Sequence, residues 1–414
     1  MIFSQHAITI IILATLISAY GINMMAEAMN IRNLKQPLPE DFKDHFDDIR
    51  YLKSQNYLKA TTKFGFIVST TDLALLLIFW FLGGFQYVDD FVRSFHLGSV
   101  VSGLIFTAIL LMLKLIISLP FTLYSTFVIE EQFGFNKTTV LLFIIDMIKS
   151  VLLSAVLGGL LLSLVLVFLE SGGPWAWVMC WAGSTVFMLA VQYIVPTWIM
   201  PLFNKFTPLE EGPLKTAIMA YADSIDFSLS NIFVMDGSKR SSRSNAFFTG
   251  FGKNKRIVLF DTLIKEQTTQ ELVSVLAHEM GHFKKRHIIK RMIWGIFQMG
   301  FIFFLISLFI SHEPLFHAFF LKEASIYAGL IFFMMLYSPI DLFVSIILQI
   351  FSRKDEYEAD CFAAKTIKTS EPLINALKKL SAHNLSNLTP HPFYVFLNYS
   401  HPPVLERIKR LRAI

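Results

Sequence analysis

Seven long apolar stretches alternate with polar connections along this chain. Each has at least the length of about 20 residues that a helix needs to cross the hydrocarbon core of a bilayer. The stretches run approximately over 7–26, 64–88, 100–129, 140–169, 174–200, 292–311 and 326–351. The pattern predicts a mainly α-helical, polytopic membrane protein with seven transmembrane helices. A signal peptide has positively charged residues before its apolar run, but no Lys or Arg precedes the first stretch here. We therefore expect this stretch to be retained.

Composition supports a protein surrounded by lipid. The chain has 414 residues, of which 54% are hydrophobic and only 16% charged. A soluble protein of this length can bury a large core with fewer apolar residues, so the lipid bilayer is the expected environment. The net charge of +5 is concentrated in particular connections. It therefore indicates topology, and no nucleic-acid partner is expected.

Positive charge alternates from one connection to the next. The connections on one side, 27–63, 130–139, 201–290 and 352–414, contain seven, one, thirteen and ten Lys and Arg residues, whereas those on the other side contain at most one each. Positively charged loops remain in the cytosol, so we expect an outside N-terminus and a cytosolic C-terminus. The compact connections favour a bacterial inner membrane over the endoplasmic reticulum membrane of a eukaryote.

Five ionisable residues interrupt the apolar stretches or lie at their margins: Asp72, Lys114, Asp146, Lys149 and Asp341. Such residues are costly in lipid and normally face a bundle interior or water. Either they pair with one another, as Lys114 with Asp146, and fix helix packing, or they line a hydrated cavity that leads to a functional site.

The chain accordingly divides into four parts. Residues 1–200 contain helices one to five and the cytosolic connection 27–63, and 201–290 form a cytosolic portion. Residues 291–351 contain helices six and seven, and 352–414 form a second cytosolic portion. Within 201–290, β-type runs at Asn231–Met235, Asn245–Thr249 and Arg256–Phe260 predict strands. The turn-forming residues 252–255 predict a hairpin between the last two runs.

His278, Glu279 and His282 form an HExxH motif, which is typical of zinc proteases. On a helix, the two histidines lie one turn apart on one face and can reach one metal ion. Thr268 and Glu271 have the spacing of a capping box, so the helix is predicted independently of the motif. Without a metal, the histidines would be a surface pair. His287 is interpreted as a charge partner for the helix end rather than as a ligand.

The third ligand is expected from the helix-forming stretch after the last span. Glu356 and Asp360 share one stripe with two alanines, so both carboxylates can be buried against another helix. Glu356 is the better ligand, with Asp360 accepting an imidazole N–H from a zinc-bound histidine. Glu358, one turn from Lys354, belongs to a solvated face. Taken alone, this acidic cluster would be a solvated helix.

His401 precedes two prolines and therefore ends an extended loop, with a helix beginning near Pro403. By itself His401 would be a structural or surface histidine. Arg407, one turn inside that helix, would be one of several basic residues exposed to solvent.

Together these residues resemble the type I CAAX prenyl proteases, which are integral membrane zinc metalloproteases. The similarity covers nearly the whole chain. Its motifs are Asn30–Pro37, Lys205–Leu209, Asp236–Ser242, Arg243–Phe247, Arg256–Leu263, the HExxH helix, Glu356–Asp360 and Tyr399–Pro403.

The resemblance implies seven helices around an intramembrane chamber, with a cytosolic zincin-type α+β metalloprotease portion. It implies one zinc ion per chain, bound by His278, His282 and Glu356, with Glu279 as the general base. Asn245 and His401 would steady the substrate and its oxyanion, and Asp360 and Arg407 would support the ligands. The strand of Asn245, Ala246, Phe247 and Phe248 would take the substrate peptide as an added strand.

The chemistry is consistent with these residue types. Zinc lowers the pKa of a water, and Glu279 takes the proton and passes it to the leaving amine. A donor such as His401 or Asn245 could contribute about 2.7–4 kcal/mol at the developing oxyanion. An exposed strand edge holds an extended peptide through its main chain.

Three functions are compatible with these features of the sequence. The first is an endopeptidase that removes the C-terminal tripeptide of prenylated proteins. The second is a quality-control protease that clears misfolded or stalled membrane proteins by the same chemistry. The third is a non-enzymatic chamber or transporter, which the buried ionisable residues would suit. The expected partners are a peptide or protein substrate, prenylated in the first case.

Overall fold

The computed structural model describes residues 4–229, 231–249 and 256–414. Among these, seven helical segments are long and apolar enough to cross a membrane, as predicted. They are α1 (Gln5–Asn33), α2 (Asp48–Phe81), α4 (Ser99–Tyr124) continued by η2 (Ser125–Glu130), α5 (Val140–Ser171), α6 (Ala176–Ile194) with η3 (Gly173–Trp175), η4 (Val195–Ile199) and α7 (Met200–Phe203) at its ends, α11 (His287–Phe309) and α13 (Ile326–Ile367).

The second predicted stretch differs most from the structure. The helix α2 begins at Asp48, because the Asp47 carboxylate caps it by accepting a hydrogen bond from the Arg50 amide. It ends at Phe81, because Gly83 adopts the left-handed conformation, with φ of 74°. The chain then turns into α3 (Gly84–Arg93), so residues 84–88 belong to a separate helix.

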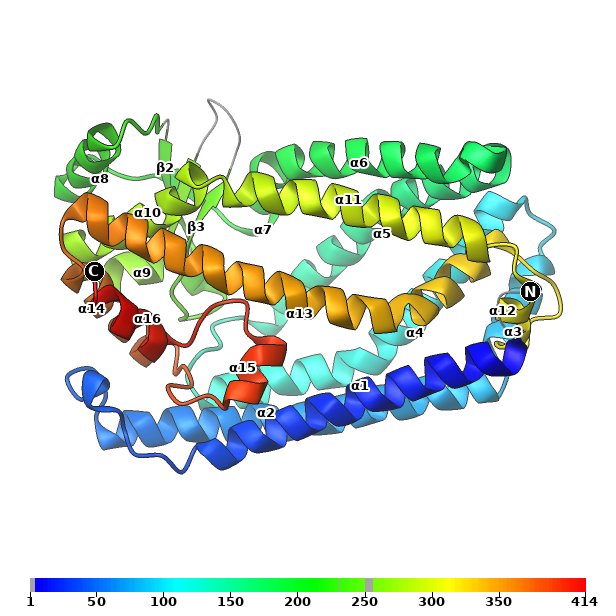
Figure 1. Ribbon diagram of the computed structural model, residues 1–414, viewed down its shortest axis with the longest axis horizontal. Helices are drawn as coiled ribbons and strands as arrows, with labels where there is room; N and C mark the ends of the chain where they lie inside the picture. The colour runs from blue at the N-terminus through cyan, green and yellow to red at the C-terminus, as the bar shows by residue number, and fades with distance from the viewer. Residues whose placement is uncertain (1–3, 230, 250–255) are drawn as a thin grey trace.

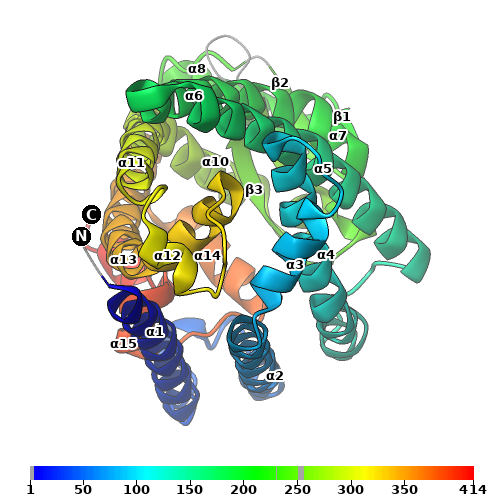
Figure 2. The same ribbon diagram turned by 90° about the vertical axis from the view of Figure 1, so that its right-hand side faces the viewer.

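The spanning helices form a ring when viewed along their axes (Figure 2). Little of each helix is buried. Within an apolar stretch of 18 residues in each span, at most 17% of the residues are buried, and none are in the span that contains α6. A tightly packed bundle would bury a full face of each helix. The low burial therefore agrees with an arrangement around a central chamber.

Four of the five ionisable side chains noted in the spans, Asp72, Lys114, Asp146 and Lys149, have polar partners, but the expected pair of Lys114 with Asp146 is wrong. The Lys114 ammonium instead contacts Asp72, joining α4 to α2 at 2.5 Å. Asp146 accepts two hydrogen bonds from Arg240, at 2.7 and 3.0 Å. Lys149 donates to the Leu202 carbonyl at 2.7 Å. Asp146 of α5 is thus linked to Arg240, which lies in the part of the chain that forms the sheet described below.

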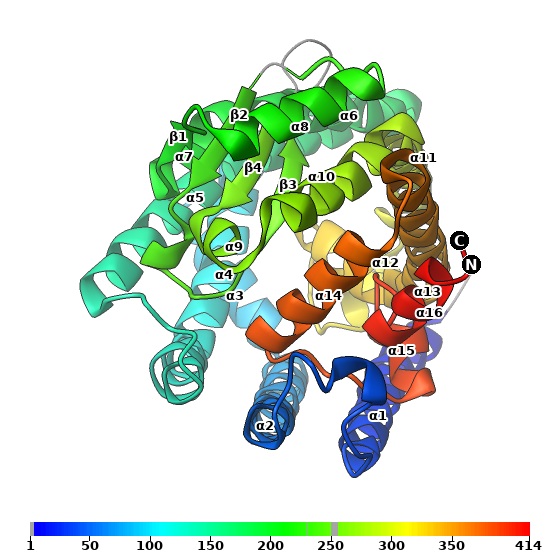
Figure 3. The same ribbon diagram turned by 90° about the vertical axis from the view of Figure 1, so that its left-hand side faces the viewer.

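Most of the remaining elements gather at one end of the ring (Figures 1 and 3). Strands β1 (Phe206–Pro208), β2 (Asn231–Met235), β3 (Ala246–Thr249) and β4 (Arg256–Phe260) form one sheet of order β1-β2-β4-β3. The predicted hairpin is confirmed, since β3 pairs antiparallel to β4. Its predicted turn, 252–255, lies outside the described residues. Because β3 is at the sheet edge, one of its sides carries no strand among the described residues.

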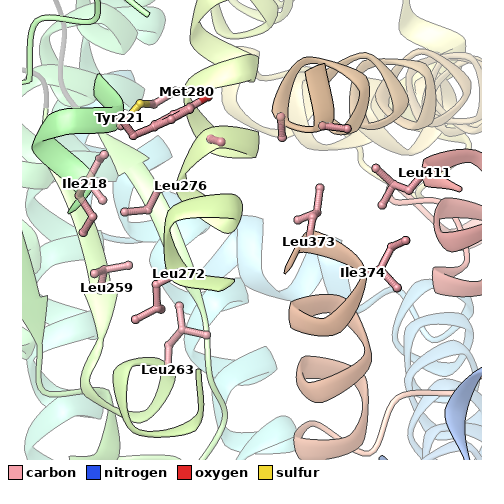
Figure 4. Close-up of a cluster of buried hydrophobic side chains, with 14 of the residues drawn as sticks. Ile218, Tyr221, Leu259, Leu263, Leu272, Leu276, Met280, Leu373, Ile374 and Leu411 are labelled. Atoms are coloured by element: carbon pink, nitrogen blue, oxygen red, sulfur yellow. The ribbon is translucent and has the colours of Figure 1, made fainter. Parts of the chain in front are cut away.

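Among the described residues, eight short helices lie at this end, and all of them except η5 and α15 contribute side chains to one buried core. They are η1 (Glu40–Phe42), α8 (Pro213–Ser224), η5 (Gly237–Lys239), α9 (Asp261–Glu266), α10 (Thr269–Lys284), α14 (Glu371–His383), α15 (Pro392–Asn398) and α16 (Val404–Leu411). Leu259 of β4, Leu276 of α10 and Leu373 of α14 are buried in one cluster (Figure 4). The opposite end carries α3 and the short α12 (Glu313–His317).

Candidate active site

The helix α10 carries the HExxH motif, and its start is fixed by the predicted capping box. The Glu271 amide donates to the Thr268 hydroxyl, and the Thr268 amide donates to the Glu271 carboxylate at 2.7 Å. Lys379 of α14 reaches the same carboxylate at 2.8 Å. Burial by itself would raise the pKa of Glu271, but the hydrogen bonds from Lys379 and Thr268 outweigh it and lower that pKa.

We therefore expect Glu271→Gln to destabilise this end of the molecule. The variant should lose about 1–2 kcal/mol of stability at neutral pH, because a cap and a charged hydrogen bond are weakened. A carboxylate with a lowered folded-state pKa stabilises above its unfolded pKa and loses this contribution as the pH falls through the folded value. Thermal melts of wild type and variant in detergent should consequently differ at pH 7 and converge in acid. An equal difference at both pH values would contradict this origin.

Three ligand-type atoms converge where α10 crosses α13. The Nε2 atoms of His278 and His282 are 3.1 Å apart, and they lie 3.4 and 3.3 Å from the two carboxylate oxygens of Glu356. A tetrahedral zinc site with bonds of 2.0–2.1 Å would separate its ligand atoms by about 3.3 Å. Buried Oε2 of Glu356 has no hydrogen-bond partner among the described residues. The three residues can thus hold a metal ion.

Asp360 and Arg407 support the first histidine from behind. Asp360 Oδ1 lies 2.9 Å from His278 Nδ1, the position expected of an imidazole N–H acceptor. Arg407 donates two hydrogen bonds to Asp360, at 2.8 and 2.6 Å. Burial alone would lower the pKa of His278, but contacts with Asp360 and Glu356 raise it to about 9. Such a cluster favours a bound cation. The solvated position considered for Arg407 is wrong, since the residue is buried.

The expected role of His287 as a charge partner for the end of its own helix is also wrong, although it is not among the three residues that could hold a metal ion. This histidine starts α11, is only 1% exposed, and brings its Nδ1 to 3.0 Å from Nδ1 of His282. Its Nε2 lies 3.2 Å from the Glu358 carboxylate and 3.5 Å from Asp355. Glu358 is therefore part of this contact as well as of the solvated face. His287 thus contacts the ring of the second histidine as Asp360 contacts that of the first.

We expect His287→Ala to weaken metal binding without unfolding the helix. Loss of a residue that orients a metal-bound histidine typically costs 10–100-fold in metal affinity. Competition of the purified protein against a chromogenic chelator would measure this change. His383→Ala, which alters a histidine on α14 outside the cluster, is the matched control. Unchanged affinity in His287→Ala would contradict a role in positioning His282.

A cleft of about 450 Å³ runs between β3 and α10. Glu279 lines it beside the histidines, and burial raises the pKa of this carboxylate. Asn245 lies at the start of β3 and lines the same cleft. His401 comes from the loop before α16, with its Nε2 3.5 Å from Glu356 and 65% of its side chain exposed. Ala246, Phe247 and Phe248 complete the wall formed by the strand.

The strand β3 is held from two sides by residues that sequence reasoning missed. Arg243 binds Glu130 at 3.0 Å and stacks over Phe135, both beyond the end of α4. On the other side, the Asn384 amide group exchanges hydrogen bonds with the Ser244 backbone, each 3.2 Å. The position of Arg243, two residues before Asn245, was an indication in the sequence that it could matter. Nothing in the sequence indicated Asn384.

Comparison with known proteins gives one consistent result. Residues 27–205 match a family model described as CAAX prenyl protease N-terminal, five membrane helices, and residues 208–414 match peptidase family M48. CAAX prenyl protease 1 of Saccharomyces cerevisiae is 38% identical over 90% of this chain and 88% of its own length. The human CAAX prenyl protease 1 homolog is 33% identical over 91% and 89%.

A solved structure agrees over the whole length. The crystal structure of S. mikatae Ste24p superimposes with a TM-score of 0.93 and 35% sequence identity, covering 98% of this chain and 99% of that one. The expected fold, seven membrane helices around a chamber with a small α+β portion at one end, is confirmed by this match and by the seven spans.

Proposed function

Because this chain belongs to peptidase family M48 and carries the membrane module of the CAAX prenyl proteases, we propose that it is a zinc endopeptidase that removes the C-terminal tripeptide of prenylated proteins. Family membership makes it a membrane metalloendopeptidase. The non-enzymatic chamber or transporter is therefore set aside.

The observation that carries the proposal is the convergence of His278, His282 and Glu356 beside Glu279. Two imidazoles and one carboxylate are the donor set of a catalytic zinc site that keeps a position open for water or substrate. The spacings of 3.1–3.4 Å between their ligand atoms suit that metal. Zinc, when bound, polarises the scissile carbonyl and makes a water nucleophilic at neutral pH.

Glu279 is the proposed general base. Its carboxylate lines the cleft next to the metal ligands, where it accepts a proton from the attacking water and then donates that proton to the leaving nitrogen. Burial raises its pKa, which brings a carboxylate nearer to the value useful for proton transfer at neutral pH. Asp360 and Arg407 keep His278 oriented.

The free edge of β3 is the proposed site for the substrate backbone. An extended peptide added beside Ala246, Phe247 and Phe248 pairs through main-chain hydrogen bonds, which tolerate many side chains. That peptide lies between the strand and α10, with its scissile carbonyl near the ligand cluster. Asn245 and His401 both line the cleft and are the proposed donors to the oxyanion.

We expect His401→Ala to lower kcat more than it raises KM. Removing one oxyanion donor costs about 10²–10³-fold in kcat, because the donor acts on charge that develops only in the transition state. Steady-state cleavage of a fluorogenic peptide measures the two constants. His6→Ala, which alters an exposed histidine of α1 outside the cleft lining, is the control. A change confined to KM would instead assign His401 to ground-state binding.

One experiment separates the two proteolytic roles. The purified chain in lipid nanodiscs receives a farnesylated reporter peptide and the same peptide without the lipid, with zinc content measured in the same sample. Strong preference for the farnesylated peptide supports the CAAX role. Similar cleavage of both supports the quality-control role, while no cleavage by the zinc-loaded protein overturns the proposal.

We further propose that the catalytic end faces the cytosol. The connections rich in Lys and Arg belong to this end, as the positive-inside rule requires. The protein is a multi-pass membrane protein. The relatives described above are eukaryotic, which supports the endoplasmic reticulum over the bacterial inner membrane favoured by the sequence. We infer that residues 201–290 and 352–414 supply catalysis, and that residues 1–200 and 291–351 form the membrane portion.

A further inference from the structure

The outer face of α13 carries a basic cavity that proteolysis does not use. It has a volume of about 620 Å³ and lies between the end of α10, α13 and α16. With about 100° per residue, Tyr357, Cys361 and Lys365 lie about 100°, 140° and 180° around the helix from Glu356. The cavity and the ligand cluster are thus on different sides of one helix. We call it the outer basic cavity. Its charged lining residues are Lys285, Arg353, Lys354, Glu358, Lys365 and Arg410.

The positive charge of this cavity is largely uncompensated. Its one carboxylate, Glu358, lies 4.0 Å from Lys354 and is shared with His287. Arg353 donates to backbone carbonyls, which do not neutralise it. Among the described residues, no carboxylate lies within 4.0 Å of the Lys285 or Lys365 ammonium. Five cations facing one acid favour an anionic ligand.

Arg410 and Tyr357 of the cavity are held in place by contacts within the protein. The Arg410 guanidinium lies 3.5 Å from the centre of the Tyr357 ring, and the Tyr357 hydroxyl donates to Glu406 at 2.9 Å. The stacked guanidinium keeps its N–H groups available in a planar array, the geometry that suits phosphate oxygens. A phosphate is therefore favoured over a simple monovalent anion.

The position of the cavity relative to lipid identifies the source of the phosphate. Phe343, Ile347 and Phe351 are 68%, 46% and 56% exposed on the preceding turns of α13, and Ile350 lines the cavity itself. The first basic residues of the cavity, Arg353 and Lys354, lie only about 3–5 Å beyond Phe351 along the helix, and Lys365 lies about 21 Å beyond it. The apolar surface thus ends where the basic surface begins, as at the edge of a bilayer. Basic clusters directly outside a membrane span bind anionic headgroups.

We propose that the outer basic cavity binds the phosphate-bearing headgroup of an anionic phospholipid, with the acyl chains along the exposed apolar surface of α13. The volume lies within the range of small-ligand pockets. The proposal depends on the membrane position of α13 and not on the proteolytic function, so each can fail without the other.

Cys361 provides the probe, because it lines the cavity, while Cys180, the other of the two cysteines, is buried. The full-length protein in nanodiscs is alkylated with a water-soluble maleimide, and intact mass gives the rate. Discs contain phosphatidylcholine alone or with phosphatidylinositol 4,5-bisphosphate. We expect the phosphoinositide to slow alkylation. Native mass spectrometry of retained lipid measures the same binding without the thiol.

The matched variants decide whether the cavity or general surface charge is responsible. Lys285→Gln/Lys365→Gln removes two cavity charges and should weaken phosphoinositide binding by about 30-fold. Lys368→Gln/Lys409→Gln removes the same charge from exposed positions outside the cavity lining and should bind like wild type. Equal weakening in both pairs overturns the proposal. Protection by soluble inositol trisphosphate as strong as by the lipid overturns the lipid as the source.

Discussion

Glu279→Gln is expected to abolish most peptide hydrolysis while leaving the metal in place. The amide keeps the size of the side chain but cannot accept a proton from water, and general-base catalysis typically contributes 10²–10⁴-fold. We therefore expect kcat for the reporter peptide to fall by about 10²–10⁴-fold. KM should change little, because Glu279 lies beside the ligand cluster and not among its three ligands. Rate measurements and metal analysis of the same preparation test both parts.

The control for Glu279→Gln has to separate chemistry from folding. Glu266→Gln alters an exposed carboxylate on α9 and should retain wild-type activity. The Glu279→Gln protein should also bind substrate, so a farnesylated peptide ought to protect it from thermal unfolding as it protects the wild type. If Glu279→Gln retains activity within a fewfold of wild type, Glu279 is not the base and the proposed chemistry fails.

Local signals in the sequence were sufficient to predict the elements of the site. The capping box at Thr268 and Glu271 formed as expected because it depends only on neighbouring residues. The β3–β4 pairing followed from two short β-type runs and a turn signal. The spans followed from apolar length, since every backbone group in lipid must be bonded within its own helix.

Partners distant in the sequence could not be predicted in the same way. Arg407 has the sequence context of a solvated helix, and only packing of α16 against α13 brings it to Asp360. His287 looked like the end of one helix, whereas a left-handed residue at Arg286, with φ of 59°, ends α10 and directs the next helix so that His287 meets His282. Asp146 was assigned to the wrong partner, because Arg240 lies 94 residues away. Such pairings depend on tertiary geometry that periodicity does not contain.

Glu356→Ala should remove the metal itself, and with it all metal-dependent hydrolysis. Glu356 is the proposed ligand on α13, and its oxygens lie 3.3–3.4 Å from the histidine nitrogens of α10. Without it, only the two imidazoles remain of the three ligands, and Asp360 is already engaged by Arg407. We expect metal content to fall from one per chain to a small fraction. Inductively coupled plasma mass spectrometry after dialysis measures it.

Glu356→Asp separates loss of the metal from loss of the base. The shorter side chain keeps the charge but moves it away from the histidines, so affinity should fall while the chemistry is retained. Added zinc should then restore much of the activity of Glu356→Asp and none of the activity of Glu279→Gln. Glu371→Gln, an exposed carboxylate at the start of α14, should resemble wild type throughout. Full metal occupancy in Glu356→Ala would show that the α13 carboxylate is not a ligand, because the remaining protein would suffice to hold the ion.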